Sequence, residues 1–328
     1  MTIPSVGILG LGSYLPPKVL TNLDLEKIVD TTDDWIITRT GIKERRIAEK
    51  GTPTSDLASE AARAALKDAH LNSSDIDLII CATISPDMLF PSTACIIQRK
   101  IGASCPAFDI SAACSGFPYA LGIAESFIRA QICRHVLVIG AEVISSFINW
   151  KDRSTCVLFG DGAGAAVVGP SVKNGNRILA TFLGSDGNQA DLLKIPAGGS
   201  AIPSTKESID AGLHYVRMEG SEVFKCAVKT MGDAIFEVLK RSGRSLEDID
   251  CLIPHQANLR ILNAVAERVG IPKEKVYINL DRYGNMSAAS TIVALSEASK
   301  DGTIRKGSFV VLVAFGSGFT WAANAIQW

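Results

Sequence analysis

The sequence predicts an α/β protein made of two similar halves, each with a mixed sheet between helices. Three pairs of matching segments support this prediction, and each pair has one member in each half of the chain. The pairs are Asp75–Ile80 with Asp248–Ile253, Cys114 with Asn285, and Phe159–Gly162 with Phe315–Gly318. Because the pairs occur in the same order, chance similarity of short motifs is the weaker explanation. We place the halves at residues 1–170 and 171–328.

Hydrophobic periodicity and turn residues predict the elements in chain order. In the first half we expect strands at 6–10, 77–82, 107–110, 136–140, 156–159 and 165–168. Helices are expected there at 22–30, from Asp33 through Arg39, at 54–70 and from about Ser115 onward. In the second half we expect helices at 222–241, 259–269 and 287–300. Its strands are expected at 251–253, at 276–280 and on both sides of 315–318.

The composition is that of an ordinary globular protein, with 328 residues, 47% hydrophobic, and a formal net charge of −1. This charge balance offers no electrostatic case for binding nucleic acid or an anionic membrane. The N-terminus lacks the basic start of a signal peptide, and no apolar run is long enough to span a membrane. The eight cysteines contain no C-x-x-C pair. We therefore expect reduced thiols in a cytoplasm and no metal site.

Cys114 lies where an extended segment turns into an apolar helix. Pro118 fits only in the first turn of that helix, which places Cys114 at the amino end. Unpaired N–H groups and the helix dipole would there favour thiolate over thiol. The alternative, a small buried apolar side chain, is equally open from this stretch alone.

His255 and Asn285 also follow expected strands, at the edge where α/β sheets place ligands. Alone, His255 is more simply a structural side chain and Asn285 a turn residue. If the halves pack about a pseudo-twofold axis, the loops bearing these residues and Cys114 converge. A thiolate, an imidazole and an amide can together attack a thioester and stabilise the negative oxygen that develops.

Six motifs in these regions resemble β-ketoacyl-acyl carrier protein synthase III over essentially the whole chain. They are A-A-C-S-G-F around Cys114, P-H-Q-A-N-L-R at 254–260, Y-G-N at 283–285, F-G-S-G-F-T-W at 315–321, D-D-W-I-I-T-R-T-G-I at 33–42 and F-G-D-G-A-G-A at 159–165. The resemblance implies the thiolase fold (αβαβα), a cytoplasmic homodimer and the first condensation of type II fatty acid synthesis. In that reaction an acyl-CoA primer condenses with malonyl-acyl carrier protein and gives 3-oxoacyl-acyl carrier protein, CO2 and CoA.

The resemblance also implies roles for individual residues. Cys114 is the nucleophile, and His255 and Asn285 hold the malonyl thioester during decarboxylation. Backbone N–H groups of Cys114 and Ser317 form the oxyanion hole, although the family usually has Gly where this chain has Ser317. The other implied contacts are Trp35, Arg39, Arg153 and Asn258 for CoA, Lys225, Gln256 and Arg260 for docking the carrier protein, and Phe90 for the acyl pocket of the partner subunit. CoA thioester is substrate here, and no separate cofactor or metal is implied.

Some readings stay open at this point. From the residues alone, Trp35 is more simply a core side chain with a solvated Arg39 beside it, and Lys225 a solvated charge. A family asparagine near the pantetheine channel appears here as Ser221. A thioesterase would use the same acyl-cysteine with water, and a non-catalytic scaffold would not need Cys114. Relatives in polyketide, quinolone or hydroxymethylglutaryl-CoA synthesis also have the cysteine, histidine and asparagine. The sequence does not show which acyl-CoA primer the enzyme uses.

Overall fold

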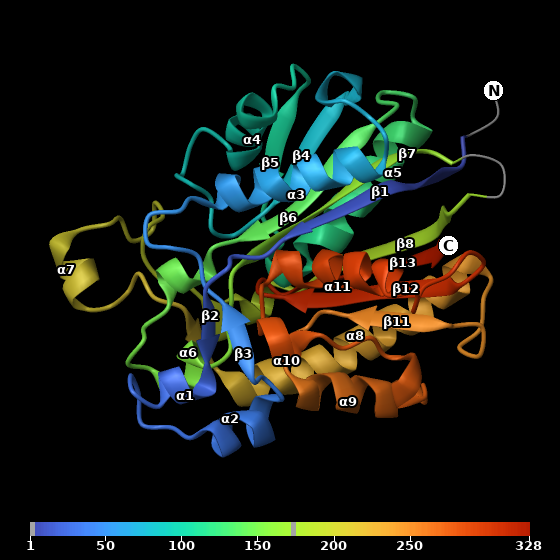
Figure 1. The fold of residues 1–328 in the computed structure, drawn as a ribbon. Coiled ribbons are helices and arrows are strands. Elements are labelled where there is room, and N and C mark those ends of the chain that lie inside the picture. The colour runs from blue at the N-terminus through green and yellow to red at the C-terminus, as the bar shows by residue number, and fades with distance from the viewer. Residues whose placement is uncertain (1–3, 172–174) are drawn as a thin grey trace.

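The computed structural model describes residues 4–171 and 175–328, and it arranges them in five layers (Figure 1). Two sheets alternate with three layers of helices, which is the αβαβα order expected from the sequence. One pair of helices covers the outer face of each sheet, and a third pair lies between the sheets. The pairs are α3 (Thr54–Asp68) with α4 (Thr93–Ile101), α8 (Gly220–Ser242) with α9 (Leu259–Val269), and, in the middle, α5 (Gly116–Arg129) with α11 (Ala288–Lys300).

The first sheet has five strands in the order β1-β7-β6-β4-β5. The outer pair β1/β7 and the pair β7/β6 are antiparallel, whereas β6/β4 and β4/β5 are parallel. The strands are β1 (Val6–Tyr14), β7 (Gly162–Pro170), β6 (Val136–Glu142), β4 (Leu78–Ala82) and β5 (Ala107–Ile110). All of them come from residues 6–170.

The second sheet repeats this pattern with strands from residues 177–327. Its order is β11-β12-β13-β8, in which the first pair is parallel and the other two are antiparallel. The strands are β11 (Cys251–Pro254), β12 (Phe309–Gly316), β13 (Thr320–Gln327) and β8 (Arg177–Ser185). The same succession of parallel and antiparallel pairs therefore appears in both sheets, beginning from β4 and from β11.

The expected strand at 276–280 is wrong. Only one parallel bridge, Leu252 to Val276, occupies the place that β5 holds in the first sheet. Asn279 draws the chain away from the sheet, since its N–H donates to Gln256 Oε1 (3.0 Å) and its Nδ2 donates to Glu297 (2.8 Å). Helical residues then begin at Leu280.

The expected strand at 156–159 is wrong as well. Cys156 ends a short helix, because the Asp152 carboxylate caps that helix by accepting from the N–H of Ser154 (2.9 Å). After it, Phe159 forms only a single parallel bridge, to Asn285. The helix expected at 22–30 is shorter and ends at Leu25.

The remaining elements are short. The helices are α1 (Asn22–Leu25), α2 (Asp33–Thr40), α6 (Arg153–Cys156), α7 (Lys206–Asp210) and α10 (Leu280–Tyr283), and the strands pair as β2 (Val19–Thr21) with β3 (Glu44–Arg46) and β9 (Leu193–Lys194) with β10 (Arg217–Met218). Short 3₁₀ segments lie at Ser73–Asp75, Ala113–Ser115, Ile144–Phe147, Gly187–Leu192 and Lys273–Lys275. The segment around α7 projects from the side of the molecule (Figure 1).

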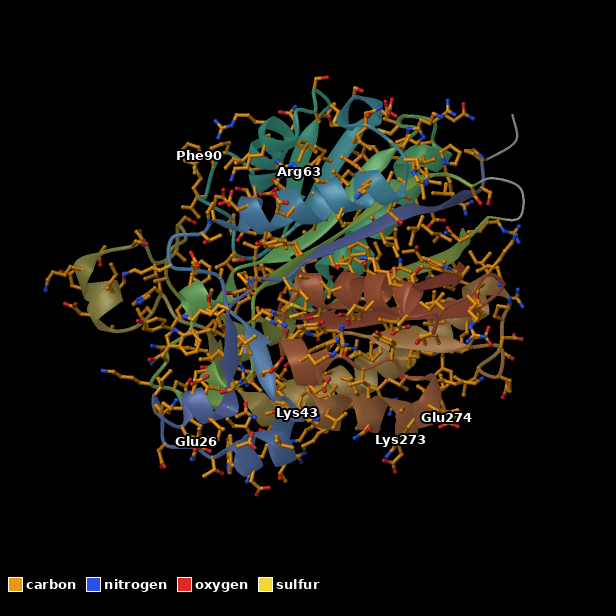
Figure 2. All side chains as sticks on the ribbon, viewed as in Figure 1. Glu26, Lys43, Arg63, Phe90, Lys273 and Glu274 are labelled. Carbon is orange, nitrogen blue, oxygen red and sulfur yellow. The ribbon has the colours of Figure 1, made fainter. Side chains whose placement is uncertain are left out.

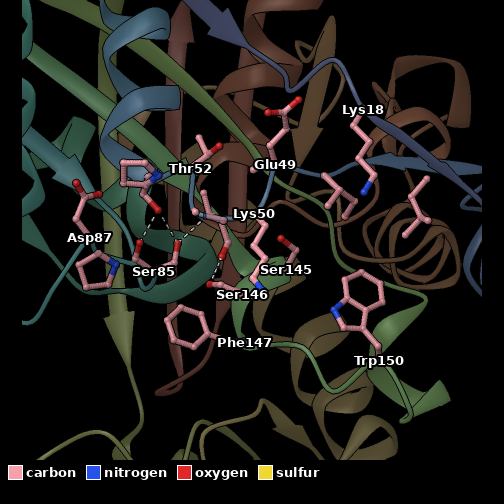
Figure 3. Close-up of a pocket in the computed structure, with 18 of the residues that line it drawn as sticks. Lys18, Glu49, Lys50, Thr52, Ser85, Asp87, Ser145, Ser146, Phe147 and Trp150 are labelled. Carbon is pink, nitrogen blue, oxygen red and sulfur yellow. Dashed lines mark hydrogen bonds between the residues drawn. The ribbon is translucent and has the colours of Figure 1, made fainter. Parts of the chain in front are cut away.

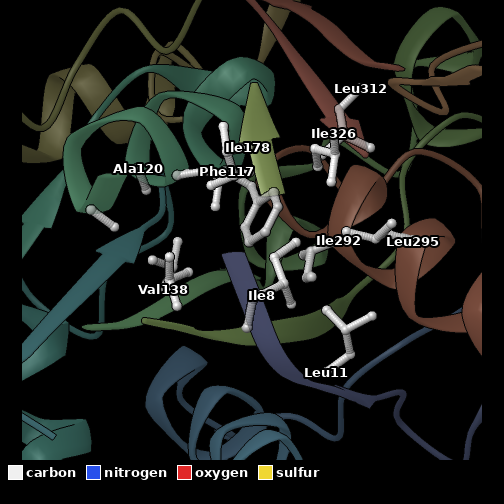
Figure 4. Close-up of a cluster of buried hydrophobic side chains, with 14 of the residues drawn as sticks. Ile8, Leu11, Phe117, Ala120, Val138, Ile178, Ile292, Leu295, Leu312 and Ile326 are labelled. Carbon is white, nitrogen blue, oxygen red and sulfur yellow. The ribbon is translucent and has the colours of Figure 1, made fainter. Parts of the chain in front are cut away.

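The core between the sheets combines side chains of α5 and α11 with side chains from both sheets (Figure 4). Phe117 on α5 and Ile292 on α11 are fully buried, and Ile8 and Leu312 approach them from the two sheets. Both helices are apolar on most sides because both of their broad faces are covered by a sheet. This packing fixes the amino ends of α5 and α11, where Cys114 and Asn285 lie, with respect to each other.

Candidate active site

Cys114 lies in the 3₁₀ turn that joins β5 to α5, so it is at the amino end of the helix as expected. The preceding residue, Ala113, has a φ of +46°, a left-handed conformation that is uncommon outside glycine. Ser115 anchors the turn, because its Oγ lies 2.7 Å from both Ala112 O and Thr320 Oγ1. Thr320 belongs to the second half, so the turn that carries Cys114 is held by both halves.

The end of β12 packs directly against this turn. A Cβ added to Gly316 would lie 2.6 Å from the backbone nitrogen of Cys114, so only glycine allows this close approach. The next residue, Ser317, turns its hydroxyl away to donate to the carbonyl of Leu193. Its side chain is thereby occupied elsewhere, and any role beside Cys114 falls to its backbone.

His255 follows β11, and its side chain is 3% exposed. Its backbone N–H donates to Val313 O (2.7 Å), which fixes it beside β12 near the Cys114 turn. Burial lowers the pKa of His255 to about 3, so the imidazole is neutral. Its Nδ1 is buried without a hydrogen-bond partner among the described residues, a costly state for a group that serves only structure.

Asn285 is held by the backbone of the opposite half. Its N–H donates to Leu158 O (2.8 Å), and its carbonyl accepts from Gly160 N (3.0 Å). The side-chain Oδ1 accepts from the N–H of Ser287 (2.8 Å). This bond orients the amide and leaves its Nδ2 donor group without a partner in the described ranges.

The structure therefore brings the loops of Cys114, His255 and Asn285 to one region. Gly316 at the end of β12 contacts the Cys114 turn, and β12 runs beside the strand that leads into His255. Ser287, two residues after Asn285, places its hydroxyl close enough to the Cys114 thiol to affect its ionisation. The neutral imidazole and the amide both belong to the C-terminal half, on loops beside the elements that pack against the Cys114 turn.

The thiolate expected at Cys114 is wrong for the protein without substrate. Burial raises the pKa of the Cys114 thiol to about 12, although the Ser287 hydroxyl and the N–H of Cys114 itself oppose the shift. The nearby Glu142 carboxylate raises the pKa further. Loss of water around the sulfur outweighs the favourable helix end, so the resting side chain is a neutral thiol.

Trp35 on α2 lies between two guanidinium groups. The Cζ atoms of Arg39 and Arg153 lie 5.2 Å and 4.7 Å from the centre of its ring. Asn258 caps α9 and also donates from Nδ2 to Arg39 O (3.2 Å). The four residues expected to contact CoA thus form one continuous group, with Trp35 half-buried rather than in the core.

Of the three residues expected to dock a carrier protein, the structure exposes two and buries one. Lys225 on α8 and Arg260 on α9 are exposed, and the Arg260 guanidinium lies 5.9 Å from the ring of Phe224 next to Lys225. Lys225 is paired with Glu222 (2.8 Å). Gln256 is fully buried, and it donates to Pro254 O (2.8 Å) and Tyr277 O (3.1 Å). The expectation for Gln256 is corrected: its side chain is a structural link that no outside partner can reach.

Phe90 lies on a loop at the edge of the molecule (Figure 2). It is 83% exposed, and the preceding Leu89 is 81% exposed. Such a pair of apolar side chains in water is typical of a surface that another chain covers.

A cavity of about 730 Å³ lies near this loop and is lined by Ser85, Asp87, Ser145, Phe147 and Trp150, among others (Figure 3). None of the site residues predicted from the sequence lines it. Lys18 and Lys50 also reach it, from the β2–β3 region. In residues 4–171 and 175–328, no group of three or more His, Cys, Asp or Glu side chains is placed to hold a metal ion.

Sequence reasoning missed three buried polar residues beneath the site. Arg45 donates to Asn22 Oδ1 (2.8 Å) and Val157 O (2.8 Å), and thereby supports the segment that holds Asn285. Glu142 and Ser287 lie beside Cys114. None of the three stands in a recognisable motif, and Glu142 ends an otherwise apolar strand, which is the one signal that marked it.

No helix within the described residues is both long enough and apolar enough to cross a bilayer.

Family comparisons match residues 108–187 to 3-Oxoacyl-[acyl-carrier-protein (ACP)] synthase III and residues 239–328 to its C-terminal part. The Beta-ketoacyl-[acyl-carrier-protein] synthase III of Caldanaerobacter subterraneus subsp. tengcongensis is 59% identical over 325 residues, covering 99% of this chain and 98% of that protein.

Solved structures agree with this assignment. The 3-oxoacyl-[acyl-carrier-protein] synthase III of Aquifex aeolicus VF5 superposes with a TM-score of 0.91 at 50% identity, covering 98% of this chain and 100% of that one. The priming β-ketosynthase of the R1128 polyketide pathway superposes with a TM-score of 0.90 at 34% identity, covering 100% and 98%. The chain therefore has the thiolase fold and belongs to the 3-oxoacyl-[acyl-carrier-protein] synthase III family.

Proposed function

We propose that this chain is a β-ketoacyl-acyl carrier protein synthase III, an acyltransferase that starts type II fatty acid synthesis. It condenses an acyl-CoA primer, acetyl-CoA or similar, with malonyl-acyl carrier protein and releases CO2 and CoA. The observation that carries the proposal is a buried cysteine at the amino end of α5, in a turn packed against the end of β12, with a buried neutral histidine after the neighbouring strand β11. In this proposal residues 1–170 supply the nucleophile and residues 171–328 supply the groups that stabilise charge.

Acyl transfer begins when the Cys114 sulfur attacks the carbonyl carbon of the acyl-CoA. The thiol proton must leave during the attack, because the resting thiol is neutral. The backbone N–H groups of Cys114 and Ser317 stabilise the oxygen that becomes negative, and the close approach of β12 to the turn supports this pairing. CoA then leaves as the C–S bond of the substrate breaks, and Cys114 keeps the acyl group.

Condensation follows at the same sulfur. His255 and Asn285 hold the thioester carbonyl of the malonyl group, and loss of CO2 leaves a carbanion whose charge is spread onto that oxygen. A neutral imidazole and an amide can both donate a hydrogen bond there. The carbanion attacks the acyl-Cys114 carbonyl, the C–S bond to Cys114 breaks, and the 3-oxoacyl product remains on the carrier protein.

Groups at the surface of the protein supply the contacts to CoA and to the carrier protein. Trp35 stacks on the adenine of CoA while Arg39 and Arg153 bind its phosphates, with Asn258 at the pantetheine arm. Lys225 and Arg260 present positive charge from α8 and α9 to the acidic carrier protein.

The exposed apolar loop suits a second copy of the chain. We place Phe90 of each subunit at the acyl pocket of its partner in a homodimer, and the large exposed fraction of Phe90 supports this placement. A cytoplasmic location, where the eight cysteines stay reduced, completes the proposal.

The test combines acetyl-CoA with isotope-labelled malonyl-acyl carrier protein and follows enzyme and product by mass spectrometry. We expect acetyl-Cys114 on the enzyme and label in a 3-oxoacyl-carrier protein. Cys114→Ala should abolish both, whereas the matched variant Cys133→Ala, at a half-buried thiol remote from the site, should retain both. Release of free acid without labelled ketoacyl product would reject condensation in favour of hydrolysis.

A further inference from the structure

The carboxylate of Glu297, near the carboxyl end of α11, accepts hydrogen bonds from three neighbouring side chains. Its Oε1 accepts from the Tyr283 hydroxyl (2.5 Å). Its Oε2 accepts from Arg282 Nη2 (2.9 Å) and from Asn279 Nδ2 (2.8 Å). All of these donors belong to the segment just before Asn285. One side chain of α11 therefore holds the segment that leads into the proposed site.

The bond to Tyr283 fixes Asn285, which comes two residues later in the chain. Only Gly284 separates them, and it is tightly packed, since an added Cβ there would lie 2.7 Å from Leu158 O. The N–H of Asn285 donates to that same carbonyl oxygen (2.8 Å). The short link has no room to absorb a displacement of Tyr283, so Asn285 moves with it.

The bond to Asn279 reaches the loop of His255 through Gln256. The N–H of Asn279 donates to Gln256 Oε1 (3.0 Å), while its Nδ2 donates to Glu297. The amide Nε2 of Gln256 donates to Pro254 O (2.8 Å), so it holds the backbone on the other side of His255. Asn279 and Gln256 are both fully buried, so water cannot replace these bonds. The loop of His255 is thereby tied to the same carboxylate.

Glu297 is itself held firmly. Its side chain is 21% exposed, and its neighbours Ala294 and Ala298 on α11 are fully buried between the sheets. Burial and the hydrogen bond to Glu297 raise the pKa of Tyr283 to about 12, so the hydroxyl keeps the proton that it donates. The same hydroxyl accepts from Arg282 Nη1 (3.0 Å), so both its donor and an acceptor site are used.

We propose that Glu297 is a positioning residue that sets His255 and Asn285 relative to each other. It therefore acts on decarboxylation of the malonyl group and not on acylation of Cys114. The inference rests on the proposed function, in which the imidazole and the amide donate to one thioester oxygen, so their separation matters in that step. Cys114 is positioned differently, by the close approach of β12 and by the hydroxyl of Thr320 beside its turn.

The test compares two rates in the intact protein. One is the acetylation of Cys114 by acetyl-CoA, followed by rapid quench and mass spectrometry. The other is the release of labelled CO2 from malonyl-acyl carrier protein that carries the label in its free carboxyl group. In Glu297→Ala we expect CO2 release to fall about 100-fold, because a displacement of about 1 Å at a reacting group has an effect of that size. Acetylation should be unchanged.

Tyr283→Phe is the second variant, because it removes a single oxygen atom and leaves the ring in place. It breaks only the link to Asn285, so CO2 release should fall about tenfold while acetylation is unchanged. The double variant with Glu297→Ala should be no slower than Glu297→Ala alone, since both substitutions remove the same contact. Glu297→Gln keeps an acceptor oxygen, and it should regain about tenfold of the lost rate of CO2 release.

The matched control is Glu125→Gln on α5. Glu125 is also a largely buried carboxylate that accepts from an arginine, Arg129 Nε (2.8 Å), and from a hydroxyl, Thr181 Oγ1 (2.9 Å). It has no bond to the loops of His255 or Asn285 among the described residues. The control should therefore keep the wild-type ratio of CO2 release to acetylation.

The ratio of the two rates decides the inference. A purely structural role for Glu297 predicts that both rates fall by the same factor as the folded fraction falls, and an unchanged ratio in Glu297→Ala overturns the proposal. Should that variant fail to fold, an unchanged ratio in Tyr283→Phe overturns it equally. Failure of the proposed function looks different, because the wild type itself would then form no acetyl-Cys114 or release no CO2.

Discussion

Gly316→Ala tests whether the end of β12 holds the nucleophile in place. The added Cβ would lie 2.6 Å from the backbone nitrogen of Cys114, and also 3.1 Å from Ala113 Cβ and Ser115 N. Restoring an ordinary contact of about 3.5 Å requires the turn and the strand to separate by roughly 0.9 Å. Both are backbone segments in the core, so neither can move by rotating a side chain.

A displacement of about 1 Å at a reacting group costs about 100-fold in rate. We therefore expect Gly316→Ala to lower the rate of Cys114 acetylation by acetyl-CoA about 100-fold, measured by rapid quench and mass spectrometry. The strained contact should also lower the free energy of unfolding by about 1–3 kcal/mol in urea titrations.

The matched control is Gly199→Ala, since an added Cβ there meets no atom within 4 Å. That variant should acetylate at the wild-type rate. If Gly316→Ala does so too while folded, the close approach of β12 has no part in placing the sulfur, and the assignment of Ser317 to the oxyanion hole loses its support.

His255→Ala and Asn285→Ala should still form acetyl-Cys114 but release no CO2 from malonyl-acyl carrier protein; normal CO2 release by either variant removes that residue from the role. Trp35→Ala should raise the KM for acyl-CoA about tenfold with kcat nearly unchanged, because it removes a stacking surface worth about 1–3 kcal/mol; an unchanged KM contradicts the adenine site. Burial raises the pKa of Glu142 to about 7 from its ordinary 4.5, so its contribution to stability is complete below pH 4.5 and is lost as the pH rises through 7. The free energy of unfolding of wild type relative to Glu142→Gln should therefore fall by about 3 kcal/mol between pH 4.5 and 8; a constant difference in urea titrations refutes the shift.

Local patterns were sufficient for much of the fold. Helix α9 runs over residues 259–269 as its periodicity predicts, and Cys114 lies at the amino end of α5 because Pro118 can occupy only a first turn. The two wrong strands share a cause. Both segments are apolar and short, and polar side chains directed the backbone elsewhere: Asp152 caps a local helix, and Asn279 makes long-range hydrogen bonds.

The site residues also differ in whether local motifs or tertiary packing decided their outcome. Motifs were enough to predict Cys114, His255 and Asn285, because each occupies a recognisable turn after a strand. The exclusion of Gln256 from the surface depended on packing, since three hydrogen bonds to distant backbone or to its own loop hold that side chain inside.

The sequence by itself determined the family and most of the elements in both halves, and it predicted which residues are the reactive groups, because these depend on residue type and spacing. Tertiary structure alone decided the charge of those groups. Burial between the two halves makes Cys114 a thiol and His255 neutral, and it brings Glu142 and Ser287 beside the sulfur. Desolvation depends on everything that surrounds a side chain, and those surroundings come from segments far apart in the chain.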